Sequence, residues 1–230
     1  MNSTSVFWCE KSSCLMTNTS PIVFVVDDDI SMRESLEALI QDGGWHVETF
    51  MSAEEFLNRP LEFVPRCLVL DISMPGLNGL ELQKRLAVER PDMPIIFITG
   101  HGNVPMAVLA MKTGAVEFLT KPFSDESLLT AIRNAIERSK SLIGRNTELQ
   151  ALKSRYARLT SREREVFALV VAGLSNKQVG SELGICEPTV KAHRGCVMRK
   201  MKAESLAELI KMATRLRVHR LSTLSTPANI

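Results

Sequence analysis

Five short apolar runs alternate with helical patterns from Pro21 to about Arg138, and this alternation limits the possible folds more than any other feature. The predicted strands are residues 22–26, 46–50, 67–70, 95–98 and 116–119, and the predicted helices lie near residues 31–42, 53–58, 79–89, 104–113 and 125–138. Runs of this length, rich in Val, Ile and Phe, are typical of buried parallel strands. We therefore expect a five-stranded, parallel, doubly wound α/β domain over residues 21–138, with right-handed crossovers.

Polar side chains stand at the ends of four of these runs. Asp27 and Asp28 follow the first run, Asp71 the third, Thr99 the fourth and Lys121 the fifth. In an open α/β sheet the carboxyl ends of the strands share one edge, where ligands bind. Three carboxylates, a hydroxyl and an ammonium at that edge suit a divalent cation and a transferred phosphoryl group.

Charge is divided unevenly along the chain. Residues 1–138 contain 11 Lys and Arg against 19 Asp and Glu, a net charge of −8, whereas residues 139–230 contain 17 against 7, a net charge of +10. An acidic half joined to a basic half indicates a regulatory or metal-binding module fused to a domain that binds a polyanion.

The remaining segments complete the expected organisation. Residues 1–20 predict a disordered lead-in, within which Met16 is a candidate for the biological start, residues 139–158 predict a helical linker, and residues 218–230 predict a flexible tail. Five cysteines at scattered spacings indicate reduced thiols. The sequence contains no apolar stretch of membrane-spanning length and no secretory signal, so we expect a soluble cytoplasmic protein without membrane contact.

The strand-end residues occur within longer motifs. These are Asp27-Asp28, Leu70-Asp71-Ile72-Ser73-Met74-Pro75-Gly76, Ile98-Thr99-Gly100-His101-Gly102 and Lys121-Pro122-Phe123. Their order and spacing resemble the receiver domain of two-component response regulators over residues 21 to about 138. The resemblance implies a flavodoxin-like receiver that is phosphorylated by a sensor histidine kinase.

The resemblance also implies roles for individual acidic residues. Asp71 would accept the phosphoryl group from a phosphohistidine of the kinase, because a carboxylate can form an acyl phosphate. Mg²⁺ would be held by Asp28, Asp71 and the Ser73 carbonyl, with Asp27 helping mainly through water.

The neighbouring strand ends receive roles from the same resemblance. Lys121 would neutralise charge on the phosphoryl oxygens, and Thr99 would donate a hydrogen bond to them. Phe118 would be the switch aromatic that turns inward as Thr99 moves, and the Lys121–Pro122 peptide bond is expected to be cis. Independently of the resemblance, we expect Asp29 to cap the following helix.

Two alternatives use the same crevice differently. Phosphatases of the haloacid-dehalogenase type need a second aspartate two residues after the nucleophile as general acid, and that position is Ser73 here. A regulator that works without phosphorylation is the other alternative, and the complete crevice argues against it. We therefore expect no enzymatic activity beyond self-phosphorylation and self-dephosphorylation at Asp71.

The basic half predicts short helices near residues 161–172, 175–183, 187–201 and 204–217. Leu159 to Val166, Gly173 to Val179 and Pro188 to His193 give a helix-turn-helix pattern around Gly184. These stretches resemble the LuxR-type DNA-binding domain, for which we expect the bounds 159–217. The whole chain therefore resembles a response regulator of the FixJ/NarL type, and its loop from Gly100 to Ala107 resembles the FixJ branch.

The resemblance implies that the helix over residues 187–201 enters the major groove of double-stranded promoter DNA. The expected contacts are Lys191 as the first base contact, Thr189, Ala192 and Arg194 near it, and Lys177 and Arg199 on phosphates. Val190, Val197 and Met201 repeat at helical spacing and are expected in the core.

Two positions depart from the family pattern. Cys186 stands where a capping Ser is frequent, and Gly195 stands where a basic residue often contacts DNA. A glycine inside a helix costs about 1 kcal/mol relative to alanine. His193 and Cys196 lie three residues apart, and we expect them to be buried packing residues rather than a metal pair.

Phosphorylation would repack the 104–113 helix and the 116–119 strand, and that face would form a homodimer on two DNA half-sites. A coiled-coil contribution to dimerisation is an alternative to a plain linker helix, although Gly144 and Asn146 weaken it. The residues that fit its a/d spacing are Leu142, Leu149, Leu152, Tyr156 and Leu159. RNA polymerase is a further candidate partner.

Overall fold

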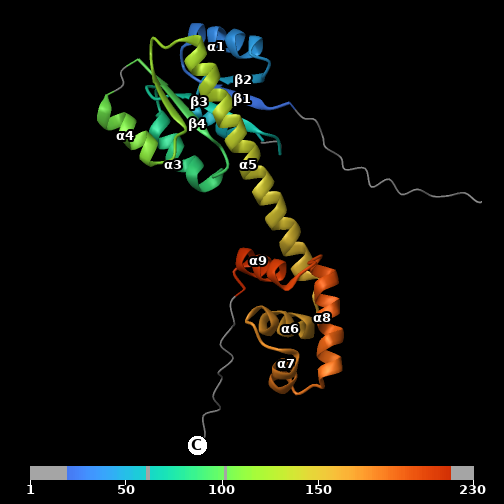
Figure 1. The fold of residues 1–230 in the computed structure, drawn as a ribbon. Coiled ribbons are helices and arrows are strands. Elements are labelled where there is room, and N and C mark those ends of the chain that lie inside the picture. Colours follow the sequence, from blue (N-terminus) through green and yellow to red (C-terminus); the bar gives the residue numbers. More distant parts are fainter. Residues whose placement is uncertain (1–19, 61–62, 101–102, 219–230) are drawn as a thin grey trace, which may run out of the picture. The chain divides into compact units, whose positions relative to one another are not determined.

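The computed structural model describes residues 20–60, 63–100 and 103–218 (Figure 1). The chain divides into two compact units, residues 1–143 and residues 144–230. Almost all of the expected lead-in and tail, together with Met16 and residues 101–102 of the FixJ-like loop, lie outside the described residues. Within the described ranges, Cys67, Cys186 and Cys196 are free thiols.

A five-stranded parallel sheet forms the centre of the first unit (Figure 1). Its strands are β1 (Ile22–Val26), β2 (His46–Phe50), β3 (Arg66–Asp71), β4 (Ile95–Thr99) and β5 (Glu117–Thr120). They lie side by side in the order β2-β1-β3-β4-β5, and each neighbouring pair is parallel. This order confirms the doubly wound, flavodoxin-like fold.

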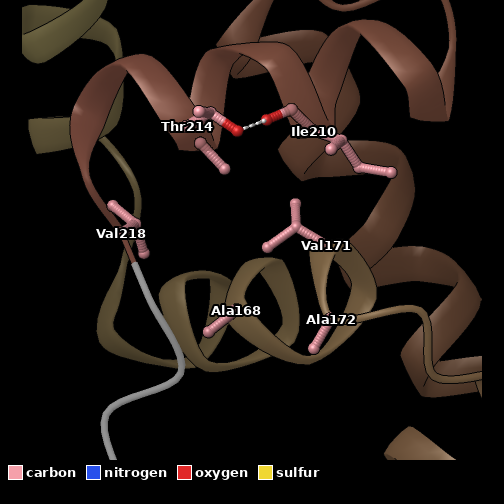
Figure 2. Close-up of a pocket in the computed structure, with 7 residues that line it drawn as sticks. Ala168, Val171, Ala172, Ile210, Thr214 and Val218 are labelled. Carbon is pink, nitrogen blue, oxygen red and sulfur yellow. Dashed lines mark hydrogen bonds between the residues drawn. The ribbon is translucent and has the colours of Figure 1, made fainter.

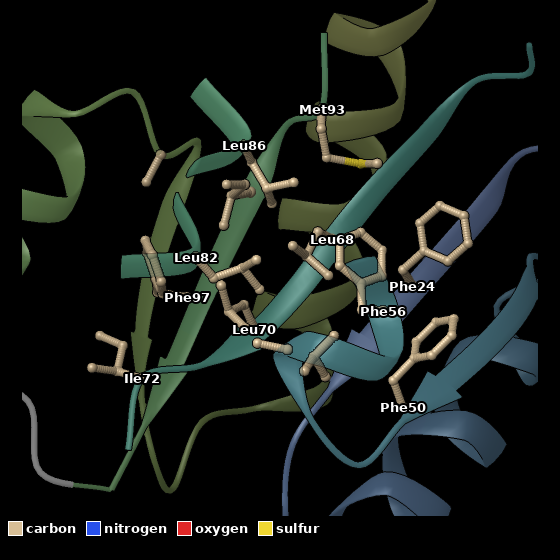
Figure 3. Packing of buried hydrophobic residues seen from close by; sticks show 14 of the residues in the cluster. Phe24, Phe50, Phe56, Leu68, Leu70, Ile72, Leu82, Leu86, Met93 and Phe97 are labelled. Atoms are coloured by element: carbon tan, nitrogen blue, oxygen red, sulfur yellow. The ribbon is translucent and has the colours of Figure 1, made fainter. Parts of the chain in front are cut away.

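Helices cover both faces of the sheet because successive strand residues point to opposite sides. The helices of this unit are α1 (Ile30–Asp42), α2 (Ala53–Asn58), α3 (Gly79–Glu89), α4 (Val104–Lys112) and the start of α5 (Asp125–Ala157). Phe24 packs with α2, α3 and α4 on one face, whereas Val23 and Val25 pack with α1 and α5 on the other. Figure 3 shows the first face, where the Phe24 and Phe56 rings lie 5.5 Å apart.

The strand register brings the polar strand ends to one edge of the sheet. Val26 pairs with Leu70, and Leu70 pairs with Phe97, so the residues that follow β1 and end β3 are neighbours. The amino end of α3 lies close to the same edge: a Cβ atom on Gly79 would be 2.5 Å from the carbonyl oxygen of Asp71. Only glycine allows this close approach without moving the strand end.

The predicted helix over 125–138 and the predicted linker over 139–158 are one continuous helix of 33 residues, α5. Ile132 and Ile136 pack against the sheet, and the Ser139 hydroxyl accepts a hydrogen bond from the Arg66 amide at 3.1 Å. Farther along the helix, Leu152 is buried in the core of the second unit. Tertiary packing at both ends thus outweighs the low helix propensity of Gly144, which costs about 1 kcal/mol.

The second unit is helical. It contains the end of α5 and the helices α6 (Ser161–Val171), α7 (Asn176–Leu183), α8 (Glu187–Met201) and α9 (Leu206–Leu216). Leu152, Tyr156 and Leu159 pack within its core, and the Tyr156 and Phe167 rings are 5.4 Å apart. Three of the residues at a/d spacing therefore contribute to the packing of this unit.

Helix caps define the helix-turn-helix. Thr160 with Glu163 and Ser175 with Gln178 form capping boxes at the starts of α6 and α7. Gly184 ends α7 with a φ of 64°, in the left-handed conformation that glycine adopts without strain. The two helices α7 and α8 around this turn confirm the predicted motif.

A small apolar hollow of about 210 Å³ lies between α6 and α9 (Figure 2). Its lining is mostly Ala, Val and Ile, and the hydroxyl of Thr214 is already bonded to the Ile210 carbonyl at 3.0 Å. The hollow therefore offers little polar chemistry to orient a ligand. Within the described ranges, no helix is both long and apolar enough to cross a lipid bilayer.

Candidate functional sites

An acidic cluster lies at the carboxyl edge of the sheet. One carboxylate oxygen from each of Asp27, Asp28 and Asp71 lies within 4.8 Å of the others. Asp27 is 0% exposed and Asp71 6% exposed, whereas Asp28 is open to solvent. Buried carboxylates need a cation or hydrogen-bond donors, and hard oxygen ligands with one open side fit a hydrated Mg²⁺ ion.

Lys121 supplies a cation to this cluster. Its Nζ lies 2.9 Å from Oδ2 of Asp27 and 3.2 Å from Oδ2 of Asp71. Burial raises the pKa of Asp27, and the hydrogen bond from Lys121 offsets this only in part. Burial alone would lower the pKa of Lys121, but its interactions with Asp27 and Asp71 raise it overall, so Lys121 is cationic at neutral pH.

The loop after β1 is held by its own hydrogen bonds. Asp29 caps α1 as predicted, because its side chain accepts a bond from the Ser31 amide at 2.9 Å. The Asp29 amide donates to Oδ1 of Asp27 at 2.9 Å, and Nη1 of Arg33 donates to the Asp27 carbonyl at 2.6 Å. Sequence reasoning missed Arg33, since its acceptor is a main-chain carbonyl that no side-chain pattern reveals.

The remaining predicted residues of the crevice occupy the neighbouring strand ends. The Ser73 amide donates to Oδ1 of Asp71 at 3.2 Å. Thr99 is fully buried at the end of β4, and its carbonyl accepts a bond from the Lys121 amide at 2.8 Å. Phe118 is half-buried against the layer formed by α2, α3 and α4. The Lys121–Pro122 bond is cis, as expected.

In the second unit, α8 separates core residues from exposed ones. Val190, Val197 and Met201 are buried, as predicted. The predicted DNA contacts that are exposed are Lys177 on α7 and Lys191, Ala192 and Arg199 on α8, whereas Thr189 and Arg194 are half-buried. The arrangement thus presents a mostly polar helix face, with Lys191 paired to Glu187 at 3.0 Å.

The residues that depart from the family pattern lie at the start and on the exposed side of α8. Cys186 is the N-cap and makes no side-chain capping bond, and its hydrogen bond with the Thr189 hydroxyl lowers the pKa of the thiol. Gly195 is exposed, and a Cβ there would meet no atom within 4 Å. His193 and Cys196 are half-buried rather than fully buried as expected.

Comparison with known proteins covers both units. Residues 23–133 match the response regulator receiver domain, and residues 157–213 match the luxR family of bacterial regulatory proteins. Nodulation protein W of Bradyrhizobium diazoefficiens is 49% identical over 209 residues, which cover 91% of this chain and 92% of that protein. The chain belongs to the two-component response regulators.

Further similarities place this response regulator in the FixJ type, with a receiver domain followed by a LuxR-type DNA-binding domain. Transcriptional regulatory protein FixJ of Bradyrhizobium diazoefficiens is 42% identical, with 84% of this chain and 94% of that protein covered. The low-resolution structure of response regulator StyR is 44% identical with a TM-score of 0.77, and the match covers 86% of this chain and 100% of StyR.

The response regulator should become more stable when Cys186 is replaced by serine. Serine is a favoured N-cap residue whose hydroxyl oxygen can accept the bond from the third amide of α8, where the Cys186 thiol makes no capping bond, so the free energy of unfolding should rise. Urea unfolding monitored by hydrogen exchange of α8 would measure the gain. Cys196→Ser, inside the same helix, is the matched control, and an equal gain there would contradict the capping explanation.

Acid should weaken the DNA-binding unit of this response regulator through Glu163. Lys200 donates to this nearly buried carboxylate at 2.6 Å and the Thr160 amide donates at 2.8 Å, and both lower its pKa below 4.5. A depressed folded-state pKa stabilises the fold above pH 4.5, and the contribution is lost as pH falls through the folded-state value.

Glu163→Gln should therefore lower the unfolding free energy at neutral pH by about 2 kcal/mol and reduce its dependence on acid. Urea unfolding at about pH 7 and about pH 4, followed by hydrogen exchange of α6, measures both effects. Glu165→Gln, on the exposed side of α6, is the control. An unaltered acid dependence in Glu163→Gln would contradict the assignment.

Proposed function

We propose that Asp71 accepts a phosphoryl group from a sensor histidine kinase and that phosphorylation makes the protein dimerise and bind promoter DNA. The acidic cluster with Lys121 is the observation that carries this proposal, because it joins a nucleophile, oxygen ligands and a cation. Asp28, Asp71 and the Ser73 carbonyl would hold Mg²⁺, with Asp27 helping through water. When bound, Mg²⁺ would neutralise charge on the phosphoryl oxygens.

The side chains divide the work of the transfer. A carboxylate oxygen of Asp71 attacks phosphorus, and the O–P bond forms as the N–P bond of the phosphohistidine breaks. The leaving imidazole keeps the electrons of the N–P bond and takes a proton from water. Lys121 stabilises the phosphoryl oxygens by charge, and the Thr99 hydroxyl donates a hydrogen bond to them. Water later cleaves the acyl phosphate to Asp71 and inorganic phosphate, and we propose no other enzymatic activity.

The surface of α4 supports the proposed homodimer. Val104 is 76% exposed, and Val108, Leu109 and Met111 are each about 45% exposed, on a helix where only Ala110 is fully buried. Apolar side chains gathered on one exposed element mark an interaction surface. We propose that Phe118, which packs beside this helix, couples phosphorylation to pairing of the α4 and β5 faces of two copies.

We propose that the second, basic unit binds the promoter DNA. Lys191, Thr189 and Ala192 on α8 are proposed to face bases, and Lys177 and Arg199 to bind phosphates. As part of the proposal we keep residues 21–138 as the receiver, 139–158 as the helical linker and 159–217 as the DNA-binding domain, with Leu152 and Tyr156 of the linker packing onto that domain. A regulator of this kind would act on the chromosome in the cytoplasm, with RNA polymerase as a further partner.

One experiment tests the proposed sequence of events. The full chain is treated with Mg²⁺ and acetyl phosphate, its mass is followed by light scattering, and its binding to a duplex selected from a random library is followed by fluorescence anisotropy. We expect phosphorylation, dimer formation and tighter binding to occur together. Equal binding before and after confirmed labelling would overturn the proposal in favour of a regulator that works without phosphorylation.

Replacing Lys191 with alanine should weaken binding to the selected duplex and relax the preference at one base position. Lys191 lies on the exposed side of α8 with its side chain 63% exposed, and a base contact of this kind is worth about 1–3 kcal/mol. A repeated selection with the variant reads the preference directly. Lys211→Ala on α9 is the control, and an unchanged preference in Lys191→Ala would rule out the contact.

A further inference from the structure

Arg194 lies on a different face of α8 from the exposed residues predicted to contact DNA. It lies four residues after Val190 and three residues before Val197, which are 0% and 1% exposed. Residues at these spacings share a helix face, so the side chain of Arg194 begins beside the buried Val190 and Val197. Ala192 and Arg199 lie instead on the exposed side.

The guanidinium of Arg194 extends to the amino end of α7. Its Nη1 donates to Oδ1 of Asn176 at 3.1 Å, and both residues are half-buried. Asn176 is the first residue of α7, and the Ser175–Gln178 capping box fixes the backbone around it. The bond therefore joins α8 to a well-defined point on α7 and limits where the guanidinium can lie.

The partner of Arg194 is a neutral amide. Within the described parts of the chain, Arg194 forms no ion pair with a carboxylate, whereas Lys191 is paired with Glu187 at 3.0 Å. Asn176 thus orients the guanidinium without cancelling its charge. The next residue, Lys177, is exposed and adds a second cation at the same helix end.

We propose that Arg194 binds a DNA phosphate rather than a base edge and that Asn176 is the positioning residue that aims it. This inference rests on the proposed DNA binding and changes the role of one residue within it. In a helix-turn-helix the first helix crosses the phosphate backbone, and helix amino ends favour anions. A planar guanidinium held beside such an end suits a phosphate.

The test compares two duplexes over a range of salt concentrations. The phosphorylated full chain and its variants are titrated by anisotropy against a duplex selected from a random library and against a scrambled duplex of equal length. Arg194→Ala should weaken binding to both by the same factor, about tenfold per protomer. The slope of log affinity against log salt should fall in magnitude by about 0.9 per protomer.

Asn176→Ala should weaken binding to both duplexes by a smaller factor than Arg194→Ala does. It should leave the salt slope unchanged, because Arg194 keeps its charge. Asn176→Asp should lower the slope, since a carboxylate would pair with the guanidinium. Combined with Arg194→Ala, Asn176→Ala should cause no further loss. Arg194→Lys retains the charge and should preserve the slope, which keeps the test informative if Arg194→Ala perturbs folding as judged by circular dichroism.

Three results would overturn the inference or its basis, and they are distinct. A changed base preference with an unchanged slope in Arg194→Ala would make Arg194 a base reader. If Asn176→Ala lowers the affinity by the same factor in the Arg194→Ala background as in the original chain, Asn176 does not act through Arg194. Failure of the phosphorylated chain without substitutions to prefer the selected duplex would instead contradict the proposed function. Lys211→Ala on α9 controls for general loss of charge.

Discussion

Asp71→Asn is expected to abolish phosphorylation of the protein by acetyl phosphate and Mg²⁺. The amide keeps the size of the side chain and can still accept the bond from the Ser73 amide, so the fold should persist. It removes the nucleophile and one of the three carboxylates of the cluster. Both losses act on the same step, so we expect the rate to fall by at least about three orders of magnitude.

Intact-mass spectrometry after incubation with acetyl phosphate measures the label directly. Asp29→Asn is the matched control, because it removes a nearby carboxylate while asparagine still caps α1. The control should label at close to the normal rate. Labelling of Asp71→Asn at that same rate would show that the phosphoryl group is accepted elsewhere, and peptide mapping would then locate it.

Lys121→Met is expected to have the largest effect on the stability of the receiver. It leaves Asp27 buried beside Asp71 without the ammonium that contacts both. Removing one partner from a buried ion pair costs roughly 3 kcal/mol. Mg²⁺ should restore part of this loss, because a divalent cation neutralises the same carboxylates when it binds the folded state. Phosphorylation should also slow by about a hundredfold.

Urea unfolding with and without Mg²⁺ tests this prediction. Trp45 packs against the α1 and α5 layer and reports on the receiver when Trp8 is replaced by phenylalanine. Lys84→Met, on the exposed side of α3, is the matched control and should change stability by less than about 0.5 kcal/mol. A loss in Lys121→Met that Mg²⁺ does not reduce would contradict the shared role of the two cations.

The crevice could be predicted from sequence because strand ends encode it. Apolar runs fix where a parallel strand stops, so Asp71, Thr99 and Lys121 follow from their positions once the sheet is inferred. Arg33 and Asn176 could not be predicted in the same way. Arg33 bonds to a backbone carbonyl, which no side-chain pattern reveals, and Asn176 bonds to a side chain 18 residues away on another helix, a contact that depends on how the two helices pack.

The helical character of the linker was predicted, but its continuity with the preceding helix was not. Residues 139–158 were expected to form a helical linker, with Gly144 and Asn146 counted against a coiled-coil seam, and α5 is helical through both residues. Local propensity favours a break there by only about 1 kcal/mol, and packing of Ile136 on one side and Leu152 on the other decides the outcome. Spacing alone also did not show whether Leu152 and Tyr156 pack within the chain or against a second copy.

The shared use of α5 sets a rule for dividing or recombining such proteins. The luxR family match begins at residue 157, yet Leu152, Tyr156 and the Glu148–Arg215 ion pair at 2.8 Å all belong to the second unit. A fragment cut at the family boundary would lose these contacts. A chimera that exchanges receivers between relatives should therefore be joined before Glu148, so that each DNA-binding half retains the helical turns on which it folds.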